Sequence, residues 1–184
     1  AILSAQSADG IYIQETDSIT IDATGDITVQ EVQFNSTLIA STVSSQADLI
    51  TTDGGVIKLL NLAGDITIND GNANGFGIRT FVAVPPSTLG GDILVRAFRD
   101  VIINSDLRSD TVGASGHVTV QAGDDIDQNA DVTTTSTAAG TGTVSLTATN
   151  ANVDAISGVD MQAGTTITTA GGNVRVLADN EGDI

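Results

Sequence analysis

The sequence predicts an all-β protein, and more narrowly a parallel β-solenoid, from a repeated strand cassette, a strand-and-turn composition and a second strand signal in each repeat. The cassette is Gly, any residue, Ile or Val, any residue, Val or Leu, often closed by Ala. Successive cassettes are 30, 36, 25, 26 and 30 residues apart and begin at Gly25, Gly55, Gly91, Gly116, Gly142 and Gly172. A unit that recurs every ~20 to 50 residues is typical of stacked repeats.

The composition supports strands rather than helices. Of the 184 residues 40% are hydrophobic but only 3% are aromatic, which suits a thin core of Ile, Val, Leu and Ala. Lys58 is the only lysine and glutamate is rare, whereas Thr, Val, Asp, Asn and Gly, which favour strands and turns, are abundant. No window shows the sustained apolar spacing of an amphipathic helix. We therefore expect one all-β segment over residues 1–184.

A second strand signal follows each cassette within about ten residues, and a weaker third signal follows the second. Ile57 and Leu59, for example, are followed by Ile66 and Ile68. Two or three short strands per coil of about 25 to 30 residues indicate a solenoid. Alternate residues point inward, so the third and fifth cassette positions should fill the core. The leading glycine permits a positive φ at the corner.

Three stretches interrupt the repeat and are expected to project as loops. Residues 33–48 are rich in Ser and Thr, residues 69–77 form a Gly/Asn run, and residues 84–91 contain the only prolines, Pro85 and Pro86. Proline cannot donate to a sheet ladder, which excludes an interior strand position there. The chain opens and closes in the middle of the repeat pattern, so we expect it to be a fragment of a longer repeat protein.

The charge excludes several classes of partner. The formal net charge is −17, with 6 basic against 23 acidic residues. Nucleic acid and anionic membrane surfaces require clustered basic residues, so neither is an expected partner. No apolar stretch is long enough for a membrane-inserted helix, so we expect no membrane insertion. There is no cysteine, which excludes disulfides and thiolate metal sites.

Two acidic stretches are candidate calcium sites, and no other cofactor is expected. Asp70, Asn72 and Asn74 place oxygen ligands at alternate positions before Gly75, as in the first half of a calcium loop. The position of the bidentate Glu is occupied by Phe81, so the loop is incomplete. The second stretch is the densest acidic cluster and includes Asp124, Asp125 and Asp127. In both places a solvated turn without a metal is the alternative.

No set of residues predicts catalysis. His117 is the only histidine, and it has no evident catalytic partners in the sequence. Four arginines lie close together in an otherwise acidic chain, at Arg79, Arg96, Arg99 and Arg108. We expect them to pair with nearby aspartates, with a contact patch for an acidic protein or glycan as the alternative.

The phrases GDITV from Gly25, GGDILVRA from Gly90, GHVTVQAGDDI from Gly116 and GGNVRVLADNEGDI from Gly171 resemble the repeats of large bacterial surface proteins of the filamentous-haemagglutinin type. The resemblance runs from about Gly10 to Ile184. It implies a right-handed β-helix, export to the bacterial cell surface or the extracellular space, and a role as a filamentous stalk or adhesin.

The expected function is that of a non-enzymatic structural or adhesive module of a surface filament. A stack of coils has two open ends, so we expect copies to associate end to end. A surface glycan or a protein is the expected ligand. Two alternatives are a pair of calcium-bridged β-sandwich adhesin modules and a β-helix enzyme that acts on polysaccharides.

Overall fold

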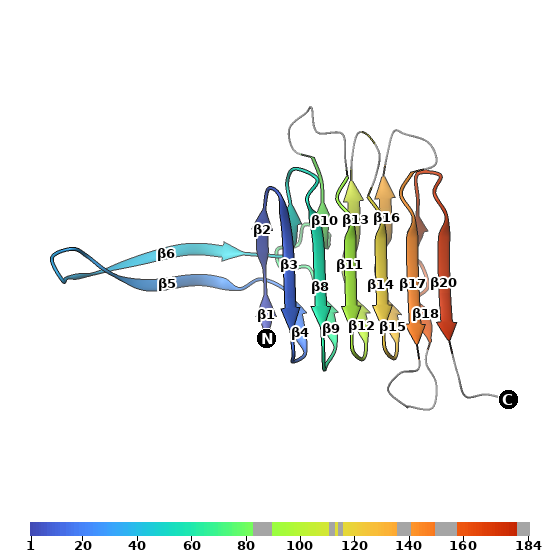
Figure 1. Cartoon of the computed structure of the whole chain (residues 1–184), viewed down its shortest axis with the longest axis horizontal. Coiled ribbons are helices and arrows are strands. Elements are labelled where there is room, and N and C mark those ends of the chain that lie inside the picture. Colours follow the sequence, from blue (N-terminus) through green and yellow to red (C-terminus); the bar gives the residue numbers. More distant parts are fainter. Residues whose placement is uncertain (83–89, 111–112, 114–115, 136–140, 150–157, 180–184) are drawn as a thin grey trace.

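The computed structural model describes residues 1–82, 90–110, 113, 116–135, 141–149 and 158–179. These residues form three parallel sheets of six strands each, here called A, B and C, and one antiparallel hairpin (Figure 1). The described part of the chain contains no helix. It therefore has no helix that is long and apolar enough to cross a membrane. The prediction of an all-β parallel solenoid is confirmed, and the alternative of two β-sandwich modules is wrong because strand pairing within all three sheets is parallel.

The chain passes through sheets A, B and C in turn, and each passage makes one coil. Sheet A contains β1 (Ile2–Leu3), β4 (Ile19–Ile21), β9 (Ile66–Ile68), β12 (Val101–Ile103), β15 (Ile126–Gln128) and β18 (Val159–Met161). Sheet B contains β2 (Ala5–Ser7), β7 (Leu49–Thr51), β10 (Phe76–Thr80), β13 (Asp106–Asp110), β16 (Val132–Thr135) and β19 (Ile167–Thr168). Sheet C contains β3 (Gly10–Glu15), β8 (Val56–Asn61), β11 (Ile93–Ala97), β14 (Val118–Ala122), β17 (Val144–Thr149) and β20 (Val174–Asp179). Coils 1 to 6 are numbered by the order of strands in each sheet.

The core is a column of aliphatic side chains between the three sheets. Alternate residues of each strand point inward, so the sheet A strands of coils 2 to 4 each bury their first and last residues. Ile21, Ile68 and Ile103 lie in register on neighbouring coils and are 0% exposed. The third and fifth cassette positions, such as Ile57 and Leu59, are buried as predicted. Each coil thus covers the apolar face of its neighbour.

The cassette glycines are required by close packing between coils more than by their φ angles. A Cβ atom on Gly91 would lie 2.1 Å from the carbonyl oxygen of Gly55, and one on Gly116 would lie 2.0 Å from the carbonyl oxygen of Gly91. Gly142 and Gly25 have positive φ angles of 76° and 70°, but Gly55, Gly91 and Gly116 do not. At these three glycines the positive φ that glycine permits is not used, and the residue is required because one corner stacks directly on the next.

Side-chain ladders join the coils at the corner between sheets A and B. The Asn104 amide nitrogen donates to Asn69 Oδ1 at 3.1 Å, and that of Asn129 donates to Asn104 Oδ1 at 2.9 Å. Asn69 in turn donates to Asp22 Oδ2 at 3.0 Å. One polar position thus repeats through coils 2 to 5 and bonds each coil to the one before it.

The largest departure from the coil is the hairpin of β5 (Gly25–Val32) and β6 (Leu38–Gln46). It leaves coil 2 between β4 and β7 and extends away from the stack (Figure 1). The cassette at Gly25 therefore belongs to this hairpin and not to a coil, and residues 33–48 contain its turn and second strand rather than a loop. The sequence could not assign this cassette correctly, because alternating apolar residues suit a strand of a parallel coil and a strand of an antiparallel hairpin equally.

The two other predicted insertions have different outcomes. Residues 69–75 form a loop between β9 and β10, while Phe76 and Gly77 already belong to β10. The insertion predicted at 84–91 lies outside the described residues, except for Gly90 and Gly91.

Candidate functional site

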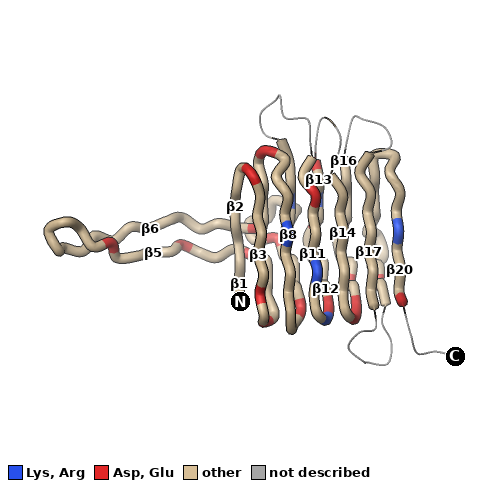
Figure 2. The backbone as a smooth tube through the Cα atoms, viewed as in Figure 1, with Lys and Arg blue, Asp and Glu red and all other residues tan. Residues whose placement is uncertain are grey.

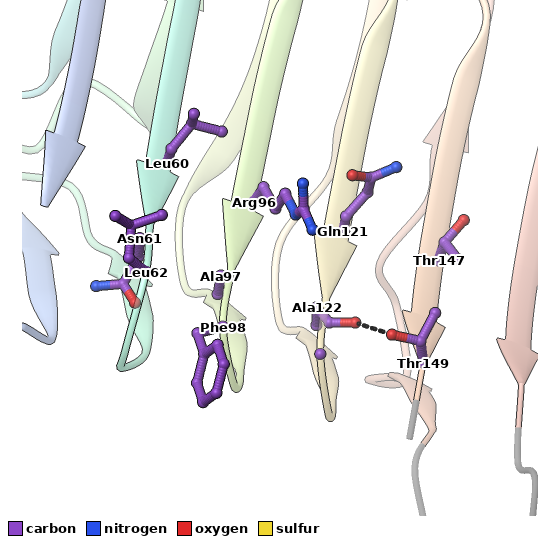
Figure 3. Close-up of a pocket in the computed structure, with 11 residues that line it drawn as sticks. Leu60, Asn61, Leu62, Arg96, Ala97, Phe98, Gln121, Ala122, Thr147 and Thr149 are labelled. Carbon is purple, nitrogen blue, oxygen red and sulfur yellow. Dashed lines mark hydrogen bonds between the residues drawn. The ribbon is translucent and has the colours of Figure 1, made fainter. Parts of the chain in front are cut away.

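A groove of about 450 Å³ crosses the outer face of sheet C near the ends of β8, β11, β14 and β17 (Figure 3). Strand register sets its first row, because Leu60, Arg96, Gln121 and Thr147 are successive partners on neighbouring coils. The groove is lined by Leu60, Asn61, Leu62, Arg96, Ala97, Phe98, Gln121, Ala122, Gly123, Thr147 and Thr149.

The groove combines apolar and polar surface. Leu62 and Phe98 lie at the corner that follows the strands and are each 47% exposed. Arg96 and Gln121 lie side by side on the strands above them (Figure 3). Gly123 lies at the same corner, where its amide donates to the Ala97 carbonyl at 3.2 Å. A groove lined by an aromatic ring and by guanidinium and amide donors can bind a planar or ring-shaped polar ligand.

Sequence reasoning missed this groove. Its first row comes from outward cassette positions on four coils, and the alternation of each strand predicts only that such residues face outward. Their relation across coils depends on the register, which the irregular repeat lengths conceal. The single available signal was Phe98, a rare aromatic residue just after a cassette.

The first predicted calcium site is a loop that binds its own backbone. Burial raises the pKa of Asp70, but backbone amides of Gly75, Asn72 and Asn74 outweigh it and hold the pKa below its usual value. The three amides donate to the Asp70 carboxylate at 2.7 to 3.1 Å. Asn72 Oδ1 accepts from the Asn74 amide at 3.1 Å, and Asn74 Oδ1 accepts from the Phe76 amide at 3.0 Å. All three predicted ligands therefore cap the turn.

Asp48, which the sequence did not single out, fixes this loop to the base of the hairpin. Its carboxylate accepts from the Gly71 amide at 2.9 Å and from Asn74 Nδ2 at 3.0 Å. The residue is 0% exposed, and burial raises its pKa. Both carboxylate oxygens are thus bonded, as a buried charged group requires.

The second predicted site is partly assembled by the fold. Carboxylate oxygens of Asp124 and Asp125 lie within 4.8 Å of each other and of one from Asp100, on the preceding coil. Hard cations such as Ca²⁺ prefer oxygen ligands of this kind. Asp127 instead lies in β15, where it is the partner of Ile102 and Asp160. Calcium binding by Asp124 and Asp125 stays a prediction, with Asp100 as the neighbour that the sequence did not indicate.

These carboxylates also belong to a second ladder between coils. Asp100 Oδ1 accepts from the Asp125 amide at 3.1 Å, and Asp125 Oδ1 accepts from the Gly158 amide at 2.7 Å. Burial raises the pKa of Asp100, and the neighbouring charges of Asp65 and Asp125 raise it further. The bond from the Asp125 amide lowers the pKa but does not outweigh these effects. The cluster therefore has a structural role whether or not it binds a metal.

Two of the four arginines pair with one of the predicted aspartates, and a third pairs with an aspartate that the sequence did not indicate. Arg79 and Arg108 contact Asp110 at 2.7 and 3.4 Å, and Arg99 contacts Asp65 at 2.8 Å. Arg79 also lies over the rings of Phe76 and Phe81, at 4.8 and 4.6 Å from their centroids. Arg96 lines the groove instead, so no single patch of four arginines forms.

His117 occupies a ladder position rather than a catalytic constellation. Its amide donates to Asp92 Oδ1 at 2.8 Å, and its Nδ1 accepts from the Thr143 amide at 3.1 Å. These bonds join coils 3, 4 and 5 to one another, as the bonds of the aspartate ladder join coils at the neighbouring corner.

The end of the stack that coil 6 forms exposes residues that would be core residues in an interior coil. Val174 and Val176 in β20 are each 47% exposed. The equivalent residues of the preceding coil, Val144 and Leu146, are buried. Each end also presents one strand edge from every sheet, namely β1, β2 and β3 at one end and β18, β19 and β20 at the other.

Comparison with known proteins adds no relative: no family model, no curated protein and no solved structure matches the chain.

Proposed function

We propose that the chain is a non-enzymatic structural and adhesive module of a bacterial cell-surface or extracellular filament, of the kind that the filamentous-haemagglutinin-like repeats suggest. The observation that carries the proposal is the pair of open ends. The edges of β18, β19 and β20 match those of β1, β2 and β3 in sheet and strand direction. One copy stacked on another would continue all three parallel sheets.

The apolar surface at each end favours such stacking. Val174 and Val176 point toward the core column and have no coil beyond them among the described residues. A second copy would cover them with the inward residues of its coil 1, such as Ile11 and Ile13 in β3. Burial of apolar surface and pairing of strand edges both stabilise this arrangement.

The use of the acidic residues also supports a structural role. Asp100, Asp125 and Asp131 each accept a bond from a backbone amide of the next coil. These carboxylates hold the stack together, which is a sufficient reason for their placement.

Sedimentation velocity over a range of concentrations tests the stacking. We expect the chain to sediment faster as its concentration rises, and Val176→Asp to remain a single stack because it places a charge in the junction. Leu177→Asp is the matched control, since Leu177 lies on the outer face of the same strand and pairs with Thr147. A wild-type chain that remains a single stack at every concentration would contradict the proposal.

The groove on sheet C supports a glycan as the ligand of the adhesive surface. Sugar rings stack on aromatic faces, and Phe98 lines the same groove as the donors Arg96 and Gln121. On a glycan array we expect Phe98→Ala to lose binding while Tyr12→Ala keeps it. Tyr12 is a 70% exposed aromatic residue of the same sheet, outside the groove. Equal binding by the two variants would exclude the groove as the glycan site.

A further inference from the structure

The hairpin β5–β6 exposes the largest group of apolar side chains in the described part of the chain. Seven of its large hydrophobic side chains are at least 48% exposed: Ile27, Val29, Val32, Phe34, Leu38, Ile39 and Val43. A two-stranded hairpin in water is only marginally stable without a surface to pack on. Contiguous exposed apolar surface of this kind marks an interaction site.

Strand register gathers four of these side chains on one face. Ile27 pairs with Val43, Val29 pairs with Ser41, and Ile39 pairs with Glu31. The opposite face is polar near the base, where Thr28 and Thr42 share a hydrogen bond of 2.8 Å. This face also carries Ser41 and Glu31, so the hairpin has one largely apolar face, and its tip is apolar.

The hairpin is also a region of low charge on a strongly acidic protein. Asp26 and Glu31 are its only charged residues, and the chain as a whole has a net charge of −17 (Figure 2). Repulsion between acidic copies is weakest where charges are few. A second copy of the chain can thus approach the hairpin more easily than it can approach the acidic corners.

The direction of the hairpin is set by bonds at its base. The Thr24 amide donates to the Gln46 carbonyl at 2.9 Å, and the Thr24 hydroxyl lies 2.9 Å from that of Ser4 in coil 1. Buried Asp48 joins the other strand to the loop of coil 3. The hairpin points along the stack axis and past β1 and β2, beyond coil 1 (Figure 1).

The length of the hairpin suits a neighbouring stack. The eight residues of β5 extend roughly 27 Å at about 3.4 Å per residue, while coils are spaced about 4.8 Å apart. Beyond coil 1 the hairpin would therefore run alongside roughly four coils of a copy stacked there.

We propose that the hairpin is a strap that lies over the corner between sheets A and B of a second copy stacked on coil 1. This inference rests on the proposed end-to-end assembly. At that corner the last coil presents the exposed residue Ala163, and the coil before it presents the half-buried Ala130. The Asp131 carboxylate there accepts from the Thr166 amide at 2.7 Å. The strap would add a lateral contact to the junction and so stabilise it beyond the pairing of strand edges.

Disulfide cross-linking tests the strap, because the chain has no cysteine. A Val43→Cys copy and an Ala163→Cys copy, mixed and mildly oxidised at a concentration where sedimentation shows assembly, should form a cross-linked heterodimer. Ser145→Cys, on the outer face of sheet C, replaces Ala163→Cys as the control and should not cross-link.

A pair of matched double variants measures the contribution of the apolar face. Val29→Thr with Ile39→Thr should weaken self-association at least tenfold, while Gln30→Thr with Ala40→Thr, on the opposite face, should leave it unchanged. Assembly in which both pairs behave alike, or in which only Val43→Cys homodimers form, would overturn the strap but not the stacking. Absence of any wild-type assembly would overturn the proposed function and the strap with it.

Discussion

At the scale of single residues, the corner glycines illustrate how the stack limits side-chain volume. A Cβ on Gly116 would lie 2.0 Å from the Gly91 carbonyl oxygen, whereas the nearest atom to a Cβ on Gly158 is Asp125 Oδ1 at 3.9 Å. We expect Gly116→Ala to lower the free energy of unfolding by about 3 kcal/mol or more, in the range of severe overpacking.

Gly158→Ala is the control and should change the free energy of unfolding by less than about 0.5 kcal/mol. Thermal unfolding followed by circular dichroism makes the comparison. Similar melting temperatures for the two variants would show that the coils do not approach each other this closely.

The aspartates give the protein an unusual dependence of stability on pH. Burial and then the charges of Asp125, Asp160 and Asp100 raise the pKa of Asp127. A carboxyl whose pKa is higher in the folded than in the unfolded state binds more protons when folded. Its contribution to stability is therefore greatest at pH values below the unfolded pKa of about 3.9. The contribution falls as the pH rises through the folded pKa.

Asp127→Asn should consequently stabilise the protein at pH 7 by about 0.5 kcal/mol, the scale of a like-charge pair across neighbouring strands. At about pH 4, where the raised pKa already leaves much of the wild-type carboxyl protonated, the same variant should differ less from the wild type. Denaturant titrations at the two pH values measure this. A variant that is less stable than the wild type at pH 7 would refute the assignment of repulsion to Asp127.

At the scale of elements, the coils and the hairpin are separable units. The hairpin contacts the stack only through its base among the described residues, where Thr24 and Gln46 are adjacent. Replacing residues 25–46 with Asn-Gly, a favoured two-residue turn, should leave the melting temperature of the single stack within about 2 °C of the wild type. A loss of cooperative unfolding in this variant would mean that the hairpin is part of the core.

The sequence predicted those features of the elements that depend on one strand at a time. Alternation alone places Ile57 and Leu59 in the core, and the Gly55 cassette marks a true coil. The same alternation at Gly25 belongs to the hairpin, since an antiparallel ribbon has the same period of two. Pattern therefore identified the strands but not the partner of each strand.

Features that join different coils could not be predicted in the same way. Asp100 meets Asp124, and Asn104 meets Asn69, only because insertions of different lengths bring these positions into register. Asp70 illustrates the opposite case, since its spacing resembles a calcium loop but its carboxylate bonds the backbone amides of its own turn. Spacing along the chain does not show which acceptor a donor will reach.

At the scale of the whole molecule, regular stacking is both the source of stability and the basis of the proposed function. Each interior coil is covered on two sides, and the exposure of Val174 and Val176 shows what a terminal coil lacks. In the proposed assembly a second copy would provide that cover at coil 6, and the hairpin, which extends beyond coil 1 at the opposite end, would add a lateral contact. The assembly would thus be a filament in which ladders, core and strap repeat from copy to copy.

Cryo-electron microscopy of the concentrated chain is the most direct test of end-to-end assembly. We predict filaments whose lengths are multiples of one stack, with a repeat of about 4.8 Å along the axis that continues across each junction. Single stacks of uniform length at every concentration, or contacts made side to side with both ends left open, would contradict the account.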